Sequence, residues 1–227
     1  MSEQSAPPRL IFDKYEIVRR LAIGGMGEIF LARQRGVAGF DRLVILKSLL
    51  PELAERPGPV EQFLDEARLV VTLNHPNIVS IYEVGLWQGV YFIAMEYING
   101  DSVHGLLQAA ARAGEILPVG AIARIVHDAA RGLDHAHHAL DTEGRPLKLV
   151  HRDVTPQNIM VRMDGVTKVV DFGVAKAAGR STRTATGVLK GKIPYMPPEQ
   201  LLGKPIDSRC DQWALGVVLW EMLACRR

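Results

Sequence analysis

Three polar residues within residues 150–173 have the types and the spacing that phosphate chemistry requires. Asp153 is followed five positions later by Asn158, and Asp171 comes close to the end of the stretch. An Asp-Gly pair at 164–165 separates two short apolar runs, which is a strong signal for a β-hairpin. Such a hairpin would bring Asp171 back to the side of Asn158.

Amide and carboxylate oxygens that lie side by side are suitable ligands for Mg²⁺ bound to the phosphates of a nucleotide. Asn158 and Asp171 would provide these oxygens, and Asp153, a few ångströms away, could take a proton from a hydroxyl group. Taken singly, each aspartate is better explained as a residue that stabilises a turn or a bulge. Together, however, these residues form the pattern HRD-x4-N followed by DFG, and chance does not explain such a pattern.

This stretch resembles the catalytic and metal-binding loops of the eukaryotic-like (Hanks-type) protein kinases. The form HRDVTPQN, together with a Gly-Gly-Met-Gly loop upstream, is similar to the bacterial serine/threonine branch of that family, and the resemblance runs from about Tyr15 to the last residue. It implies an α+β, bilobal protein-kinase-like fold. The N-lobe would be a five-stranded antiparallel sheet with one main helix, and the C-lobe would be mainly helical.

The periodicity of apolar residues agrees with this organisation. The first ten residues are polar overall, contain proline and lack an apolar segment of the signal-peptide type, which indicates a disordered leader over 1–12. Residues 13–98 would form the N-lobe and 99–227 a partial C-lobe. We expect strands at 15–21, 22–34, 43–49, 78–84 and 90–97, a turn at 85–89, and a helix over about 59–73. Further helices are expected from 103, over 119–139, and from 211 to about 224.

The resemblance also implies a nucleotide site. Lys47 would reach the α- and β-phosphates, and Glu66 would form an ion pair that holds Lys47 in place. Taken alone, Glu66 would be interpreted as a solvated helix charge, but the resemblance favours the ion pair. Asp101 would bind the ribose or cap a helix. The residues implied to bind ATP are Ala22, Ile23, Gly24, Gly25, Met26, Gly27, Ile29, Ile45, Lys47, Met95, Glu96, Ile98, Asp101 and Met160.

In the second lobe, the resemblance assigns Asp153 to the acceptor hydroxyl, and Asn158 and Asp171 to the metal. Thr184 and Thr186 stand where related kinases place activating phosphothreonines, and Arg152 could bind the added phosphate; the alternative is a loop whose threonines have no such role. Asp211 would accept hydrogen bonds from the backbone of the 151–153 loop. The implied structural residues are His151, Arg152, Phe172, Gly173, Glu199 and Asp211.

Several positions depart from the family pattern. Ala22 replaces a glycine and Ile45 replaces an alanine, so ATP affinity is expected to be reduced. A lysine usually found two residues after the catalytic aspartate is Thr155, and a threonine usually found after the glycine of the substrate-site loop is Lys192. We expect Lys192 to supply the missing ammonium, with Thr155 as its hydrogen-bond partner. The competing interpretation is that both roles are lost.

Composition limits the other classes of function. The chain has 227 residues, 48% of them hydrophobic, and a net charge of +2 with both signs well mixed, so we expect a globular protein with no nucleic-acid partner. Cys210 and Cys225 are too few for a disulfide framework, which indicates a cytoplasmic protein, and no segment is apolar enough to span a membrane. The histidines at 127, 135, 137 and 138 lack further metal ligands and are interpreted as core or surface residues.

The sequence therefore predicts a serine/threonine protein kinase that uses ATP and Mg²⁺, with Mn²⁺ as an alternative ion, and that acts on protein substrates. Self-association for autophosphorylation is a further expectation. Tyrosine specificity is disfavoured because the segment around Thr155 lacks the Ala/Arg pattern of the tyrosine branch. The alternative function is a nucleotide-binding pseudokinase or an inactive scaffold. Because the chain stops at Arg227, soon after the helix that Asp211 opens, we expect a catalytic domain without its last helices, including the arginine that would pair with Glu199.

Overall fold

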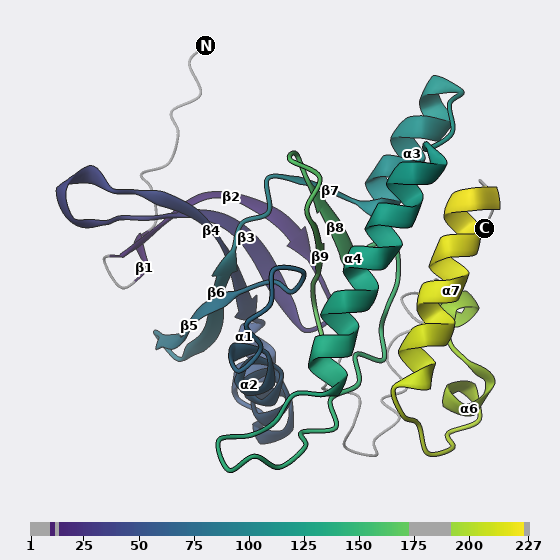
Figure 1. The fold of residues 1–227 in the computed structure, drawn as a ribbon. Coiled ribbons are helices and arrows are strands. Elements are labelled where there is room, and N and C mark those ends of the chain that lie inside the picture. Colours follow the sequence, from purple (N-terminus) through teal and green to yellow (C-terminus); the bar gives the residue numbers. More distant parts are fainter. Residues whose placement is uncertain (1–9, 12–13, 173–191, 225–227) are drawn as a thin grey trace. The chain divides into compact units, whose positions relative to one another are not determined.

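The computed structural model describes residues 10–11, 14–172 and 192–224, and it forms two compact units (Figure 1). The first unit comprises Met1–Ala67 and Ser80–Tyr97, and the second comprises Arg68–Val79 and Ile98–Arg227. The division after Tyr97 lies one residue from the boundary expected from the sequence, whereas the assignment of 68–79 to the second unit was not predicted.

The first unit is built on an antiparallel sheet with the strand order β1-β2-β3-β4-β6-β5. The five expected strands are present, and Leu10–Ile11 of the predicted disordered leader form a sixth, short strand that pairs with Tyr15 and Glu16. The strands are β1 (Leu10–Ile11), β2 (Tyr15–Ile23), β3 (Gly27–Gln34), β4 (Arg42–Leu49), β5 (Ile81–Trp87) and β6 (Val90–Glu96); η1 (Val37–Gly39) joins β3 to β4.

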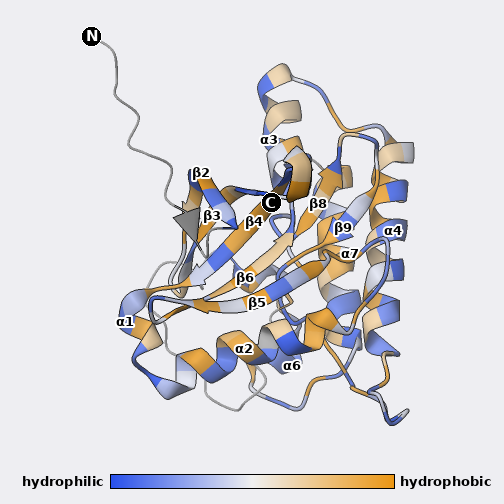
Figure 2. Ribbon diagram, turned by 90° about the vertical axis from the view of Figure 1, so that its left-hand side faces the viewer, coloured by the Kyte–Doolittle hydropathy of each residue, from blue (hydrophilic) through white to orange (hydrophobic). Residues whose placement is uncertain are grey.

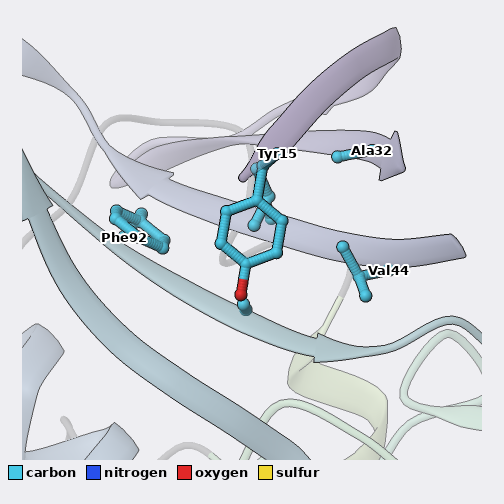
Figure 3. Packing of buried hydrophobic residues seen from close by; sticks show 6 residues of the cluster. Tyr15, Ala32, Val44 and Phe92 are labelled. Carbon is cyan, nitrogen blue, oxygen red and sulfur yellow. The ribbon is translucent and has the colours of Figure 1, made fainter. Parts of the chain in front are cut away.

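Alternating side chains give this sheet two different faces. On one face, Val44 and Phe92 pack with Tyr15 and Ala32 in a buried cluster (Figure 3). The rings of Tyr15 and Phe92 meet edge to face, with their centroids 5.9 Å apart. The buried tyrosine satisfies its hydroxyl by donating a hydrogen bond of 2.8 Å to Glu83. This face is therefore a packed core.

The helix α2 (Pro57–Val71), preceded by the short α1 (Pro51–Ala54), packs on the other face. Its buried Phe63 and Ala67 contact Leu49 and Ile93 of the sheet. The helix begins two residues before the expected position because prolines are well tolerated in the first turn of a helix. It places the residues around Glu66 on the same side of the sheet as Lys47.

Two expectations about the 78–97 region were wrong in detail. Ile78 and Val79 do not belong to β5; Ile78 bridges Val169, and the N–H of Val79 donates to the carbonyl of Val169 in the second unit. The turn between β5 and β6 is also shorter than 85–89, because β5 continues through Gly85. At Gly85 a Cβ would lie 2.5 Å from the ring of Phe92, so this glycine makes room for packing rather than for a turn.

The second unit contains the helices α3 (Val103–Ala113), α4 (Val119–His137), α6 (Pro198–Leu201) and α7 (Arg209–Ala224), with the short η3 (Ile193–Tyr195). It also has a small antiparallel sheet, β7 (Gly100–Ser102), β8 (Ile159–Arg162) and β9 (Thr167–Val169). The hairpin β8–β9 has the predicted turn, with Gly165 at a φ of 85°. The strand β7 was not predicted.

The long helix α4 is the centre of the second unit and packs against α7 and β9. Its apolar residues recur at helical spacing, so one side of the helix is hydrophobic and the other hydrophilic (Figure 2). Gly132 lies where α4 passes the backbone of Asn77, whose side-chain amide donates a hydrogen bond of 2.9 Å to the carbonyl of Thr167. A Cβ on Gly132 would lie only 2.7 Å from the carbonyl oxygen of Asn77.

We therefore predict that Gly132→Ala destabilises the protein by about 1–3 kcal/mol, because a backbone group and not a flexible side chain must move. The matched control is Gly216→Ala in α7, where an added Cβ meets nothing within 4 Å. That change should stabilise by up to about 1 kcal/mol through helix propensity. Thermal unfolding of the two variants measures the difference, and equal stability would contradict the packing described for α4.

Candidate functional site

The loop that carries Asp153 is held by a buried carboxylate on α7. Asp211, which is 0% exposed, accepts hydrogen bonds of 2.8 Å from the backbone N–H groups of His151 and Arg152, one on each oxygen. The Nε2 of His137, at the end of α4, lies 2.8 Å from one of the same oxygens. Asp211 thus joins α4, α7 and the loop. The resemblance implied its hydrogen bonds to the loop backbone but not its contact with α4.

Two opposing effects act on the pKa of Asp211. Burial raises it, but the hydrogen bonds from His137 and from the two backbone N–H groups outweigh burial and hold the pKa below its usual value. A lowered carboxyl pKa contributes stability that is present above the ordinary pKa and is lost only as the pH falls through the lowered one. The anchor is therefore ionised at neutral pH.

His151 is fully buried and uses both ring nitrogens within the unit. Its Nδ1 accepts a hydrogen bond of 3.2 Å from the N–H of Asp153, and its Nε2 lies 3.1 Å from the carbonyl of Val170. The ring packs on Phe172 with a centroid distance of 4.6 Å. Burial lowers the pKa of His151, so the ring is neutral and must carry its proton on Nε2 to donate to Val170. This ring connects the Asp153 loop to the segment before Asp171.

The predicted neighbours Asp153, Asn158 and Asp171 are brought together. The side-chain nitrogen of Asn158 lies 2.8 Å from the carbonyl oxygen of Asp153 and 3.1 Å from its carboxylate. The N–H of Val170 donates to the carbonyl of Asn158 at 3.0 Å, which places Asp171 next to Asn158. Asp171 has a φ of 54°, in the left-handed region that non-glycine residues rarely adopt.

Lys192 lies beside Asp153, but its contact differs from the one expected. Its Nζ is 2.5 Å from the Asp153 carboxylate, whereas the expected hydrogen bond to Thr155 is not formed. Thr155 is 2% exposed, and its hydroxyl has no hydrogen-bond partner within the part of the chain that the structure describes. A carboxylate accepts a hydrogen bond from an ammonium group more strongly than a hydroxyl does, and the Lys192 ammonium contacts Asp153.

Further contacts join the 192–201 segment to this loop. The side-chain amide of Gln200 donates a hydrogen bond of 3.0 Å to the carbonyl of Arg152, and the buried Tyr195 hydroxyl lies 2.5 Å from Glu221 on α7.

Glu199 is half-buried in the first turn of α6. The Nε of Arg152 is buried without a hydrogen-bond partner among the described residues. Gly173, Thr184 and Thr186 lie outside those residues.

In the first unit, the glycine-rich turn joins β2 to β3. The N–H of Gly24 donates to the carbonyl of Gly27 at 2.8 Å, and Ile23, Gly25 and Met26 complete the turn. A Cβ on Gly27 would lie 2.1 Å from the carbonyl oxygen of Ser48, so close packing of β3 on β4 also requires this glycine. The turn is where the sequence predicted it.

Lys47 projects from the face of the sheet that α2 covers. It is paired with Ile29 of β3 and Ile93 of β6, and directly opposed residues in an antiparallel sheet share a face. Ile45, two residues before Lys47, is paired with Met95 on the same face, and Ala22 is paired with Ile29. Glu66 lies on α2, but its side chain is outside the described part of the chain, so its pairing with Lys47 stays a prediction.

The remaining predicted nucleotide residues lie on both sides of the boundary between the units. Glu96 ends β6 in the first unit, and Ile98 (7% exposed) and Met160 belong to the second. Asp101 does not cap a helix. Its carboxylate accepts a hydrogen bond of 2.7 Å from the N–H of Ser102, and it is the Ser102 hydroxyl that caps α3 by accepting from Gly105.

His137, which the sequence analysis interpreted as a core or surface residue, and Gln200, which it did not name, both support the loop. Their contacts join positions far apart in the chain, and a histidine in an amphipathic helix gives no signal for such a contact. Within the described residues, no group of three or more His, Cys, Asp or Glu side chains could hold a metal ion. None of the helices described is both long and apolar enough to cross a membrane.

Comparison with known proteins agrees with this geometry. Among curated proteins, tyrosine-protein kinase MasK of Myxococcus xanthus is 49% identical to the chain over 212 residues, covering 93% of the chain and 33% of MasK. Serine/threonine-protein kinase PknB of Mycobacterium leprae is 36% identical, covering 96% of the chain and 33% of PknB. The chain thus spans about a third of the length of these relatives.

A solved structure supports the fold assignment. The crystal structure of the PknI kinase domain of Mycobacterium tuberculosis is similar with a TM-score of 0.69 and 30% identity, covering 97% of this chain and 78% of that one. The protein kinase domain family matches residues 15–227, which is nearly the whole chain. The chain belongs to the protein kinase family.

Proposed function

We propose that the chain is the catalytic domain of a protein kinase that transfers the γ-phosphoryl group of ATP to serine and threonine hydroxyls of proteins. The observation that carries the proposal is the grouping of Asp153 and Asn158, on the loop anchored by Asp211, with Asp171 at the end of the β8–β9 hairpin. A protein that only bound nucleotide would not need a carboxylate held in this position, which weighs against the pseudokinase alternative.

The donor set suits a divalent cation carried by ATP. The side-chain nitrogen of Asn158 faces the carbonyl and carboxylate of Asp153, which leaves its side-chain oxygen available for a metal beside Asp171. Two oxygen ligands from the protein, with phosphate oxygens and water completing the shell, are typical of Mg²⁺, and Mn²⁺ would accept the same ligands. When bound, the metal would neutralise charge that develops on the phosphates.

The protein residues would position the reactants. Asp153 would orient the acceptor hydroxyl and take its proton, and Lys47, supported by Glu66, would bind the α- and β-phosphates. The glycine-rich turn would cover the phosphates with backbone N–H groups. Ile45 and Met95, which share the Lys47 face, would contact the adenine, and Asp101 the ribose.

Tyrosine is the second candidate acceptor. The relative that is 49% identical is named a tyrosine-protein kinase, whereas PknB, at 36% identity, is named a serine/threonine-protein kinase. Thr155 also departs from the serine/threonine pattern. We favour serine and threonine because HRDVTPQN lacks the Ala/Arg pattern of the tyrosine branch. Self-association for autophosphorylation and a cytoplasmic location, where ATP is available, complete the proposal.

Asp153 is the residue whose replacement tests the proposed reaction. Replacing it with Asn keeps the shape of the side chain but removes the base, so phosphoryl transfer should fall by at least about 100-fold while ATP remains bound. Transfer of the labelled γ-phosphate to the chain itself and to peptides with Ser, Thr or Tyr as the only acceptor measures both rate and specificity.

Two outcomes would contradict the proposal. A parent chain that binds ATP but transfers nothing to any peptide would support the pseudokinase alternative. A parent chain that phosphorylates only the tyrosine peptide would show that the acceptor was assigned wrongly. The control Asp134→Asn changes an exposed aspartate on α4 and should transfer at the parent rate.

A separate prediction concerns Thr184 and Thr186. We expect phosphate on these threonines after incubation with ATP, and we expect Arg152 to bind it, because its buried Nε has no partner among the described residues. Mass spectrometry of the intact and digested chain locates the phosphate. Phosphate found only at other sites, such as Ser181 or Thr182, would rule out this assignment.

A further inference from the structure

The cation that contacts the candidate catalytic aspartate comes from a distant part of the chain. Lys192 follows Asp153 by 39 residues and brings its Nζ to 2.5 Å from the Asp153 carboxylate. The Asp153 side chain is 9% exposed, and that of Lys192 is 32% exposed. Because the Asp153 carboxylate is largely shielded from water, the attraction between the two charges is stronger than in an ion pair on an open surface.

Lys192 is positioned by packing that does not involve Asp153. It directly precedes η3, and Tyr195 at the end of η3 is buried with its hydroxyl 2.5 Å from Glu221 of α7. The same helix carries Asp211, which holds the Asp153 loop. One helix therefore fixes both partners of the Lys192–Asp153 pair.

Thr155 lines the same small cavity as Asp153 and Lys192. It is 2% exposed, and its hydroxyl has no hydrogen-bond partner in the described ranges. Asp153, Thr155 and Lys192 line one small cavity of about 10 Å³, which is about the volume that a single water needs.

We propose that Lys192 is a catalytic residue that screens the transferring phosphoryl group, and that positions 155 and 192 are interchangeable carriers of a single ammonium beside Asp153. The inference rests on the proposed kinase function. During transfer, the acceptor oxygen forms a bond to the γ-phosphorus and the bond from that phosphorus to the bridging oxygen of ADP breaks. The hydroxyl proton passes to Asp153, while Lys192 keeps all its protons and acts by charge alone.

Exchange of the two residue types tests this proposal. We would compare the parent with Lys192→Thr, Thr155→Lys and the double variant Thr155→Lys/Lys192→Thr. Lys192→Thr should lower kcat by at least about 100-fold with the KM for ATP changed by less than about threefold. Thr155→Lys alone should lower kcat at least about 10-fold, because two ammonium groups then compete for one carboxylate. The double variant should recover to within about 10-fold of the parent.

A second measurement separates catalysis from folding. Lys192→Thr should bind ADP as the parent does but bind ADP with aluminium fluoride, a mimic of the transferring phosphoryl group, at least about 10-fold more weakly. Lys204→Thr, which removes an exposed lysine from the same part of the chain, serves as the matched control and should behave as the parent in both assays.

Three results would overturn the inference. Transfer by Lys192→Thr at the parent rate would remove the catalytic role, and a double variant no more active than Lys192→Thr would show that the two positions are not interchangeable. Equal loss of ADP and aluminium fluoride complex binding would mean that Lys192 is structural only. Absence of transfer by the parent itself would instead refute the proposed function, and this inference with it.

Discussion

The candidate site depends on one buried charge, the carboxylate of Asp211. An ionised group that is 0% exposed is costly unless hydrogen bonds replace its water, and Asp211 receives them from the backbone of His151 and Arg152 and from the ring of His137. Removing any of these donors would leave charge uncompensated. The loop backbone is thereby fixed at the two residues before Asp153, so the orientation of the candidate base follows from α7.

The anchor extends its influence through His151 and the hairpin. His151 receives the N–H of Asp153 and contacts the carbonyl of Val170, so it ties the loop to the strand end that carries Asp171. Because burial keeps the ring neutral, one nitrogen can accept while the other donates. Asn158 then joins Asp153 to the hairpin from the other side. The positions of the proposed metal ligands and the proposed base are therefore coupled.

Local signals in the sequence were sufficient for the hairpin, the glycine-rich turn and most strands, because Asp164-Gly165 and the alternating apolar residues act over a few positions. They were misleading at Gly85, where glycine makes room for the ring of Phe92, and at Ile78, which belongs to the second unit and bridges Val169. His137 contacts Asp211, and Lys192 contacts Asp153 and not Thr155; both are side-chain contacts between residues far apart in the sequence. Such choices depend on competing acceptors in three dimensions and leave no periodic pattern in a single sequence.

Amide hydrogen exchange in the parent and in Asp211→Asn tests most directly whether Asp211 holds the loop. The amide substitution removes the charge and presents N–H groups to the backbone donors of the loop, so exchange at His151 and Arg152 should accelerate at least about 100-fold, with phosphoryl transfer lost in parallel. The N–H of Val169, bonded to the carbonyl of Asn77, serves as the reference and should be unchanged. Unchanged exchange at His151 and Arg152, with transfer retained, would contradict the central claim that Asp211 holds the loop that carries Asp153.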